Sequence, residues 1–111
     1  MLLEHSDNGA RSASGIGYFL MFPDVHWDPW YHAGSVENCG EPVCCRARDN
    51  DHVYENATYA GKFGSYELCD ASTAVLDSMF AYIQANITST LPVDFAIWVG
   101  DAPVHVCVCC S

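Results

Sequence analysis

The sequence has few basic residues and no long apolar run. The only positively charged side chains are Arg11, Arg46, Arg48 and Lys62, against fourteen aspartates and glutamates, which gives a formal net charge of -10. Binding to a nucleic-acid backbone requires clustered positive charge, so no nucleic-acid patch is expected. An anionic membrane surface would repel the chain for the same reason. No segment approaches the roughly 20 apolar residues of a membrane span, so no transmembrane segment is expected either.

A secretory signal is also missing, because residues 1–7 lack a basic start and an apolar stretch. Other features are nevertheless typical of an extracellular or lumenal protein. There are seven cysteines in 111 residues, and the triplets that begin at Asn56 and Asn86 are glycosylation acceptors. The conflict between these features predicts a chain that is incomplete at its front. The length allows one domain with a modest core.

The pattern along the chain predicts a β-loop-α-β unit within an α/β fold. Apolar runs at residues 17–23 and 94–100 read as buried strands, and residues 24–68, rich in Gly, Pro, Asn, Asp and Cys, read as a long loop. Asp70 is the expected N-cap of a helix that ends near Asn86. Its buried face follows helical spacing and consists of Leu76, Met79, Phe80 and Ile83. Three short elements cannot cover both faces of a parallel sheet, so the unit is expected to open a larger α/β domain.

An acidic residue follows each apolar run, Asp24 after the first and Asp101 after the second. Neighbouring parallel strands end at the same edge of a sheet, so both carboxylates should face one small volume. Two carboxylates that close repel unless a proton or a metal lies between them. His26 adds an imidazole of the kind that zinc and iron accept, and Gly100 allows a sharp turn and a close approach. Taken alone, the pair favours the simpler interpretation, with Asp24 as a turn former and His26 as a surface residue. The second acidic residue, after Gly100, makes the metal interpretation comparable to it.

The cysteines favour disulfides over a zinc site, because their spacing lacks paired C-x2-C motifs. Adjacent cysteines rarely bond to each other, so the preferred pairing is Cys39 with Cys44 and Cys45 with Cys69, although other connectivities remain open. The tail at residues 107–111 contains a C-x-x-C spacing in Cys107, Cys109 and Cys110. A redox role is disfavoured there, because no helix can follow to lower a thiol pKa. Their partners are expected outside this chain.

Three aromatic residues, Trp27, Trp30 and Tyr31, follow the first acidic residue closely. Aromatic faces can bind a quaternary ammonium group by cation-π attraction. The favoured interpretation is simpler: these rings cap the open end of the sheet.

Four blocks of sequence resemble the acid sphingomyelinases, a family of calcineurin-like metallophosphoesterases. The blocks are residues 24–31 (DVHWDPWY), 39–46 (CGEPVCCR), 60–70 (AGKFGSYELCD) and 98–105 (WVGDAPVH). The resemblance covers about residues 17–106, in order and with compatible spacing. The D-x-H pattern is common by itself, whereas the Cys-Cys-Arg and Gly-Asp-x-Pro-x-His blocks together are not.

This resemblance implies part of a four-layer α/β/β/α catalytic domain that hydrolyses sphingomyelin to ceramide and phosphocholine with two zinc ions. Asp24 and His26 match ligands of the first metal, and Asp101 matches the carboxylate that bridges both. His105 matches a histidine near the scissile bond that protonates the leaving alkoxide. The implied partner is a phospholipid or another phosphodiester, and the implied location is secreted or lysosomal. The resemblance leaves the oligomeric state undefined.

Departures from the family leave alternatives open. Pro23 stands where the family usually has Thr, and the later Asn-His and Gly-His-x-His ligands lie beyond residue 111. We therefore expect the 17–106 body, between an unstructured lead-in at 1–16 and the divergent tail, to be inactive alone. The alternatives are a relative that cleaves nucleotide phosphodiesters or phosphate esters, a small secreted disulfide module without chemistry, and a truncated non-functional product.

Overall fold

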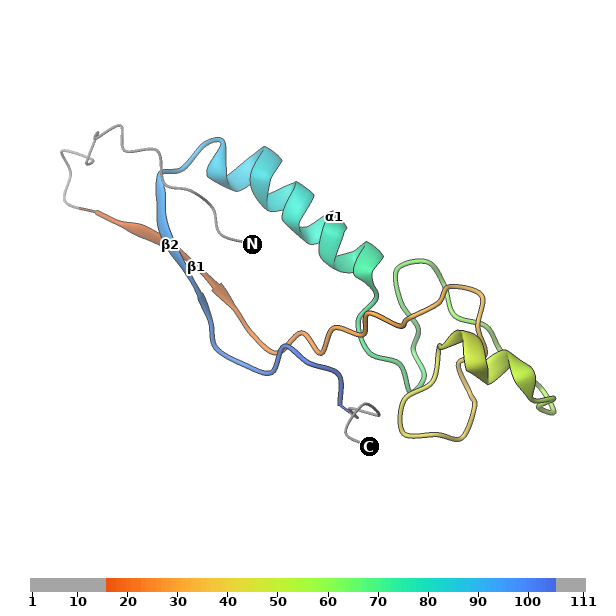
Figure 1. Ribbon diagram of the computed structural model, residues 1–111. Helices are drawn as coiled ribbons and strands as arrows, with labels where there is room; N and C mark the ends of the chain where they lie inside the picture. The colour runs from red at the N-terminus through yellow and green to blue at the C-terminus, as the bar shows by residue number, and fades with distance from the viewer. Residues whose placement is uncertain (1–15, 106–111) are drawn as a thin grey trace.

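The computed structural model describes residues 16–105 and has a small mixed α/β fold (Figure 1). In chain order, its elements are β1 (Tyr18–Phe22), the 3-10 helix η1 (Ala47–Asp51), α1 (Thr73–Ile83), the π-helical turn η2 (Gln84–Thr88) and β2 (Val93–Trp98). This order is the predicted β-loop-α-β unit, with η1 as an addition inside the loop. None of the helical segments within residues 16–105 is long and apolar enough to cross a membrane.

The two strands form a parallel sheet in which Phe22 lies opposite Trp98. One face of this sheet meets α1, because Phe22 contacts Phe80 of the helix with ring centroids 5.8 Å apart. On the other face, Phe19 and Phe95 stack at 5.3 Å. A crossover helix joins the strands, as parallel pairing requires. Figure 1 shows α1 running alongside the two strands.

The strands were predicted to be buried, and in this chain they are not. Phe19 is 54% exposed and Met21 is 64% exposed, and every residue of β2 after Val93 is exposed. The cause is the small number of elements, since one helix can cover only one face of a sheet. The strands are apolar enough to favour burial. Within residues 16–105, however, too few elements are present to cover them.

The helix begins later than predicted, because Ser72 and not Asp70 is its N-cap. The Ser72 hydroxyl accepts a hydrogen bond from the Val75 N–H at 3.2 Å, which satisfies one of the free donors of the first turn. No residue of α1 is fully buried. The predicted apolar face is only partly covered: Phe80 is exposed, whereas the remaining three members are half-buried.

The buried core of the described residues lies in the loop between β1 and α1. Its apolar members are Val36, Cys39, Val43, Cys44, Cys45 and Ala60. Two disulfides, Cys39–Cys44 and Cys45–Cys69, run through this core and have the pairing preferred from the sequence. Short bridges pair Tyr31 with Arg46 and Val36 with Tyr59, so the loop is fastened by both covalent and backbone bonds.

Two predicted segments lie outside the described residues. The lead-in at 1–16 falls there except for Ile16, and so does the tail at 107–111 with Cys107, Cys109 and Cys110. The predicted domain boundaries therefore stay predictions.

Candidate functional site

The two strands end side by side, and the segments that follow them stay paired. The Val99 N–H donates to the Phe22 carbonyl at 2.8 Å, and one step further the Asp101 carbonyl accepts from the Val25 N–H at 2.9 Å and the His26 N–H at 3.2 Å. These bonds place residues 24–26 against residues 99–101 at the carboxyl end of the sheet. This is the edge where parallel α/β sheets bind their ligands.

Asp24 is locked into this edge by one of its two carboxylate oxygens. Its Oδ1 accepts the Asp101 main-chain N–H at 2.8 Å. Its Oδ2 lies 3.9 Å from Nε2 of His26, too far for a hydrogen bond. The Asp24 side chain is 61% exposed, so the free oxygen is accessible from solvent.

His26 has a backbone conformation that is uncommon for a side chain other than glycine, with φ at +48°. Such a conformation costs on the order of 1 kcal/mol and concentrates at functional sites. The ring is fixed through Nδ1, which lies 3.1 Å from the Pro103 carbonyl oxygen. A carbonyl only accepts, so Nδ1 carries the proton and Nε2 offers its lone pair on the side of Asp24.

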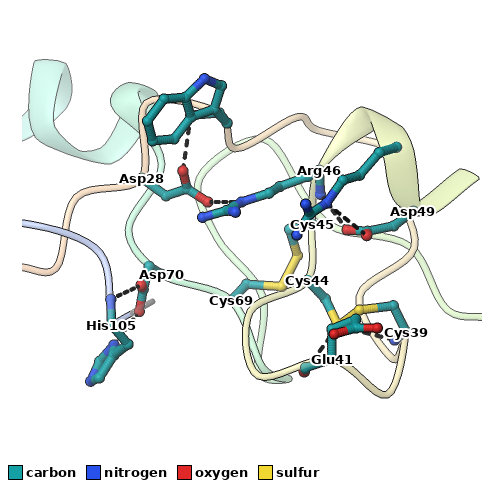
Figure 2. A network of polar contacts seen from close by, with 12 residues as sticks. Asp28, Cys39, Glu41, Cys44, Cys45, Arg46, Asp49, Cys69, Asp70 and His105 are labelled. Carbon is teal, nitrogen blue, oxygen red and sulfur yellow. Dashed lines mark hydrogen bonds and ion pairs between the residues drawn. A yellow bond between two sulfur atoms is a disulfide. The ribbon is translucent and has the colours of Figure 1, made fainter. Parts of the chain in front are cut away.

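His105 lies on the same edge and stacks on His26. The two ring centroids are 3.7 Å apart, and the planes differ by 19°. His105 is in turn held by Asp70, which contacts both its main-chain N–H and its Nδ1 (Figure 2). From the sequence, Asp70 was predicted only to be a helix cap. Its place at the end of the block 60–70 was the available signal for a role in the site.

The donor atoms of Asp24 and His26 fit a divalent metal as a pair. Their separation of 3.9 Å is within the roughly 4.2 Å that two ligands of one zinc ion can span, given zinc–ligand bonds of about 2.1 Å. Asp101 joins this edge through its main chain. No group of three or more His, Cys, Asp or Glu side chains within residues 16–105 is arranged to hold an ion. The part of the chain that the structure describes therefore supplies a pair of donors and no three-ligand cluster.

The aromatic residues beside the site are engaged by the chain itself. The Arg46 guanidinium lies 5.6 Å from the centre of the Trp30 ring, so a cation of this protein already occupies that face. The Trp27 indole donates to the Thr73 hydroxyl at 3.0 Å. The Tyr31 hydroxyl donates to the Gly61 carbonyl at 2.7 Å, and burial, helped by the nearby Glu37 carboxylate, raises the pKa of Tyr31.

The loop behind the site is organised by a buried ion pair (Figure 2). Asp28 is fully buried, and its Oδ2 accepts from Nε of Arg46 at 2.9 Å, while its Oδ1 accepts from the Trp30 N–H at the same distance. Arg46 is itself 6% exposed. Its main-chain N–H donates to Asp49 at 2.7 Å. From the sequence, Asp28 and Arg46 were noted only as parts of two motif blocks, with no contact predicted between them.

The two candidate glycosylation residues differ in their surroundings. Asn56 is exposed in a turn, whereas Asn86 lies in η2 and donates its side-chain N–H to the Tyr82 carbonyl at 3.1 Å.

Comparisons with known proteins agree with the motifs. No family model matches the chain. Sphingomyelin phosphodiesterase A of Dictyostelium discoideum is 41% identical over 95 residues, which are 86% of this chain and 14% of that protein. The sphingomyelin phosphodiesterase of Homo sapiens is 31% identical over 81% of this chain and 14% of its own length. A cyclic GMP-AMP phosphodiesterase of Homo sapiens is 33% identical over 88% of this chain and 19% of its own length.

These three relatives are all named phosphodiesterases, which is the class that the resemblance of the four sequence blocks implied. More particularly, the chain is similar in sequence to the sphingomyelin phosphodiesterases, as its motifs indicated. It spans 14% of the length of the Dictyostelium relative named above.

Proposed function

We propose that this chain carries part of the catalytic site of a phosphodiesterase that hydrolyses sphingomyelin to ceramide and phosphocholine. One observation carries the proposal: donor atoms of Asp24 and His26 converge at the end of paired parallel strands, and His105 stacks on His26. The 41% identity to a sphingomyelin phosphodiesterase supports the substrate class. The exposed apolar sheet supports the further proposal that the unit belongs to a four-layer α/β/β/α metallophosphoesterase domain.

Within this proposal, Asp24 and His26 would hold a first zinc ion, and the Asp101 carboxylate would be a further zinc ligand. Bound zinc supplies Lewis-acid chemistry, since it lowers the pKa of a bound water and neutralises charge on phosphate oxygens. The chain's own contribution is orientation. The Pro103 carbonyl fixes the His26 tautomer so that Nε2 remains a lone-pair donor, and the Asp101 N–H fixes one oxygen of Asp24 and frees the other.

His105 is the proposed acid for the leaving group. As hydroxide oxygen bonds to phosphorus, the bond from phosphorus to the departing alkoxide breaks, and its electron pair goes to that oxygen. The alkoxide takes the proton on Nε2 of His105, which is left neutral and regains a proton from solvent. The His105 side chain is 59% exposed, which allows this exchange with water.

A second candidate substrate is a nucleotide phosphodiester. The human cyclic GMP-AMP phosphodiesterase is 33% identical to this chain, a value close to the 31% of the human sphingomyelin phosphodiesterase. The proposed site of Asp24, His26 and His105 acts on a phosphodiester group. Sphingomyelin and the nucleotide substrate both contain this group, so these residues do not distinguish between them. Sphingomyelin is preferred because two relatives with that substrate in their name are 41% identical to this chain, against 33% for the cyclic GMP-AMP phosphodiesterase.

The proposed location is secreted or lysosomal. Two disulfides inside a buried core support an oxidising compartment, because cytosolic thiols are kept reduced.

Zinc titration of the full chain tests the metal site. The tail cysteines Cys107, Cys109 and Cys110 should be replaced by serine in every sample, since free thiolates bind zinc themselves. Asp24→Ala is expected to weaken zinc binding about 10-fold or more, because a first ligand is lost. Asp77→Ala removes the same charge from an exposed position of α1 and should leave binding unchanged. Equal zinc affinity in both variants contradicts the proposal.

Turnover tests the reaction. The isolated chain is expected to hydrolyse little sphingomyelin, because three ligands cannot hold two zinc ions in fixed geometry. The aligned segment of the Dictyostelium sphingomyelin phosphodiesterase A can be replaced by residues 17–105 of this chain. We expect this chimera to cleave sphingomyelin in preference to cyclic GMP-AMP and to lose turnover on Asp24→Ala. An inactive chimera that still folds and binds zinc contradicts the proposal, and a reversed preference selects the nucleotide candidate.

A further inference from the structure

Asp70 belongs to no proposed metal ligand set, yet both of its carboxylate oxygens are directed to His105. Its Oδ2 accepts the His105 main-chain N–H at 2.8 Å, and its Oδ1 lies 2.5 Å from Nδ1 of the ring. The Asp70 side chain is 6% exposed, whereas the His105 side chain is 59% exposed. A buried carboxylate thus contacts Nδ1 of a ring whose side chain is largely exposed to solvent.

This contact defines which ring nitrogen carries a proton. An ionised carboxylate has acceptors only, so the short contact to Nδ1 requires a proton on that atom. The second ring nitrogen, Nε2, is then the one available for exchange with a substrate. The bond to the main chain adds a second restraint, because it fixes the backbone of residue 105 relative to the same carboxylate.

Asp70 is itself held in place from both sides. On one side, Cys69 forms the disulfide with Cys45. On the other, the Ala71 N–H donates to the His26 carbonyl at 2.9 Å, and the Ala71 carbonyl accepts from the Asp28 N–H at 2.9 Å. The segment 69–71 is therefore tied to the backbone of residues 26–28, so the carboxylate has a fixed position relative to the site edge.

His26 restricts the same ring at one of its faces. Its ring stacks on His105 at 3.7 Å, and its own Nδ1 is fixed by the Pro103 carbonyl, two residues before His105. The His105 ring is thus restrained at Nδ1 by an anchored carboxylate and on one face by an anchored imidazole. Exposed histidines without such contacts sample several ring orientations, which costs entropy when one orientation is needed for proton transfer.

We propose that Asp70 is a positioning residue that holds His105 in the Nδ1–H tautomer and in a single ring orientation, leaving Nε2 to serve the leaving group. The catalytic consequence rests on the proposed function, whereas the tautomer and the ring orientation do not. The loop disulfide Cys45–Cys69 acts through Asp70 in the same way, because it fixes the residue next to it.

Nitrogen-15 NMR of the histidine rings tests the inference on the full chain with native disulfides. At about pH 8, two-bond correlations distinguish the two tautomers of a neutral imidazole ring. We expect the His105 ring to be in the Nδ1–H form. In Asp70→Ala it should move toward the Nε2–H form, whereas the matched variant Asp77→Ala should leave it unchanged. An Nε2–H ring in the unsubstituted chain overturns the inference, even if Asp70→Ala fails to fold.

Kinetics in the Dictyostelium chimera supply a second readout. Asp70→Ala is expected to lower kcat on sphingomyelin about 10- to 100-fold with little change in KM, the usual effect of losing a residue that orients a catalytic group. A phosphodiester with a nitrophenolate leaving group needs no proton, so its turnover should fall much less. An equal loss on both substrates overturns the positioning role. An inactive chimera would instead count against the proposed function, with the His105 tautomer still deciding the inference.

Discussion

The α-carbon of Gly100 lies directly against the carboxylate of Asp24. A β-carbon at position 100 would be 1.7 Å from Oδ1 of Asp24 and 2.5 Å from its main-chain nitrogen. Gly100 does not have a positive φ, so the reason for glycine is this close approach and not a left-handed turn. The same approach lets Asp24 accept the Asp101 N–H.

Gly100→Ala should therefore displace Asp24 and separate the two strand ends. We expect it to lower the free energy of unfolding by about 1 to 3 kcal/mol, the range for overpacking, and to remove the hydrogen bond of the Asp101 N–H. Urea unfolding and hydrogen exchange of the Asp101 amide measure the two effects. Gly64→Ala is the matched control, because a β-carbon at Gly64 meets open space. Comparable losses in the two variants would show that the close contact at Gly100 is unimportant.

Sequence patterns predicted the two strands and the helix, because the spacing of apolar residues depends on local sequence. They also predicted that the two strands end at the same edge, because a crossover helix makes the strands parallel. They placed Asp24, His26 and Asp101 at one edge, and the structure brings their backbones together there. They did not reveal Asp70, since its contact with His105 spans 35 residues and leaves no periodic signal. The buried pair of Asp28 and Arg46 was missed for the same reason.

Burial was the least predictable property. Apolar strands indicate what a sheet prefers to contact, but the contact itself depends on how many elements are present to cover it. In residues 16–105 the fully buried side chains belong to the loop, where Cys44 and Cys45 have no exposed surface. The composition of this loop, rich in Gly, Pro and Asn, did not predict that the loop would contain the buried core.

Replacing Arg46 should be far more damaging than replacing Arg48, although both remove one positive charge. Arg46→Ala leaves the fully buried Asp28 carboxylate without its cation, which costs about 3 kcal/mol or more. The Arg48 side chain is 51% exposed and reaches Asp49 only at 3.9 Å, so Arg48→Ala should cost about 0.5 kcal/mol or less. Denaturant midpoints measure the difference. Similar midpoints would mean that water replaces the Arg46 contact.

The two disulfides should contribute unequally to stability. Cys45–Cys69 closes a loop with a sequence separation of 24, whereas Cys39–Cys44 closes one of 5. In the chain-entropy model, replacing the first pair by serine costs about 3 to 4 kcal/mol and replacing the second about 2 kcal/mol. Urea unfolding of the two double variants gives the comparison. Only the first substitution should also alter the NMR signals of His105, because Cys69 precedes Asp70; a change in both or in neither contradicts this link.

Glycosylation should favour Asn56 over Asn86. Asn56 is exposed in a turn with φ at +58°. The Asn38 side chain stabilises that turn, because it donates a hydrogen bond to the Asn56 carbonyl and accepts one from the Thr58 N–H, both at 3.0 Å. Acceptor triplets are used in surface loops, which this turn provides and η2 does not.

Thr58→Ala and Thr88→Ala are the matched variants for this comparison, because each removes one acceptor triplet and leaves the asparagine in its own conformation. When the chain is secreted from eukaryotic cells with an added signal sequence, Thr58→Ala should remove most of the mass that peptide N-glycosidase releases. Thr88→Ala should remove little of it. Mass spectrometry of the released and intact chains measures both. A larger loss for Thr88→Ala would mean that the acceptor triplets are selected before the helix and the turn form, since an unfolded chain presents both asparagines alike.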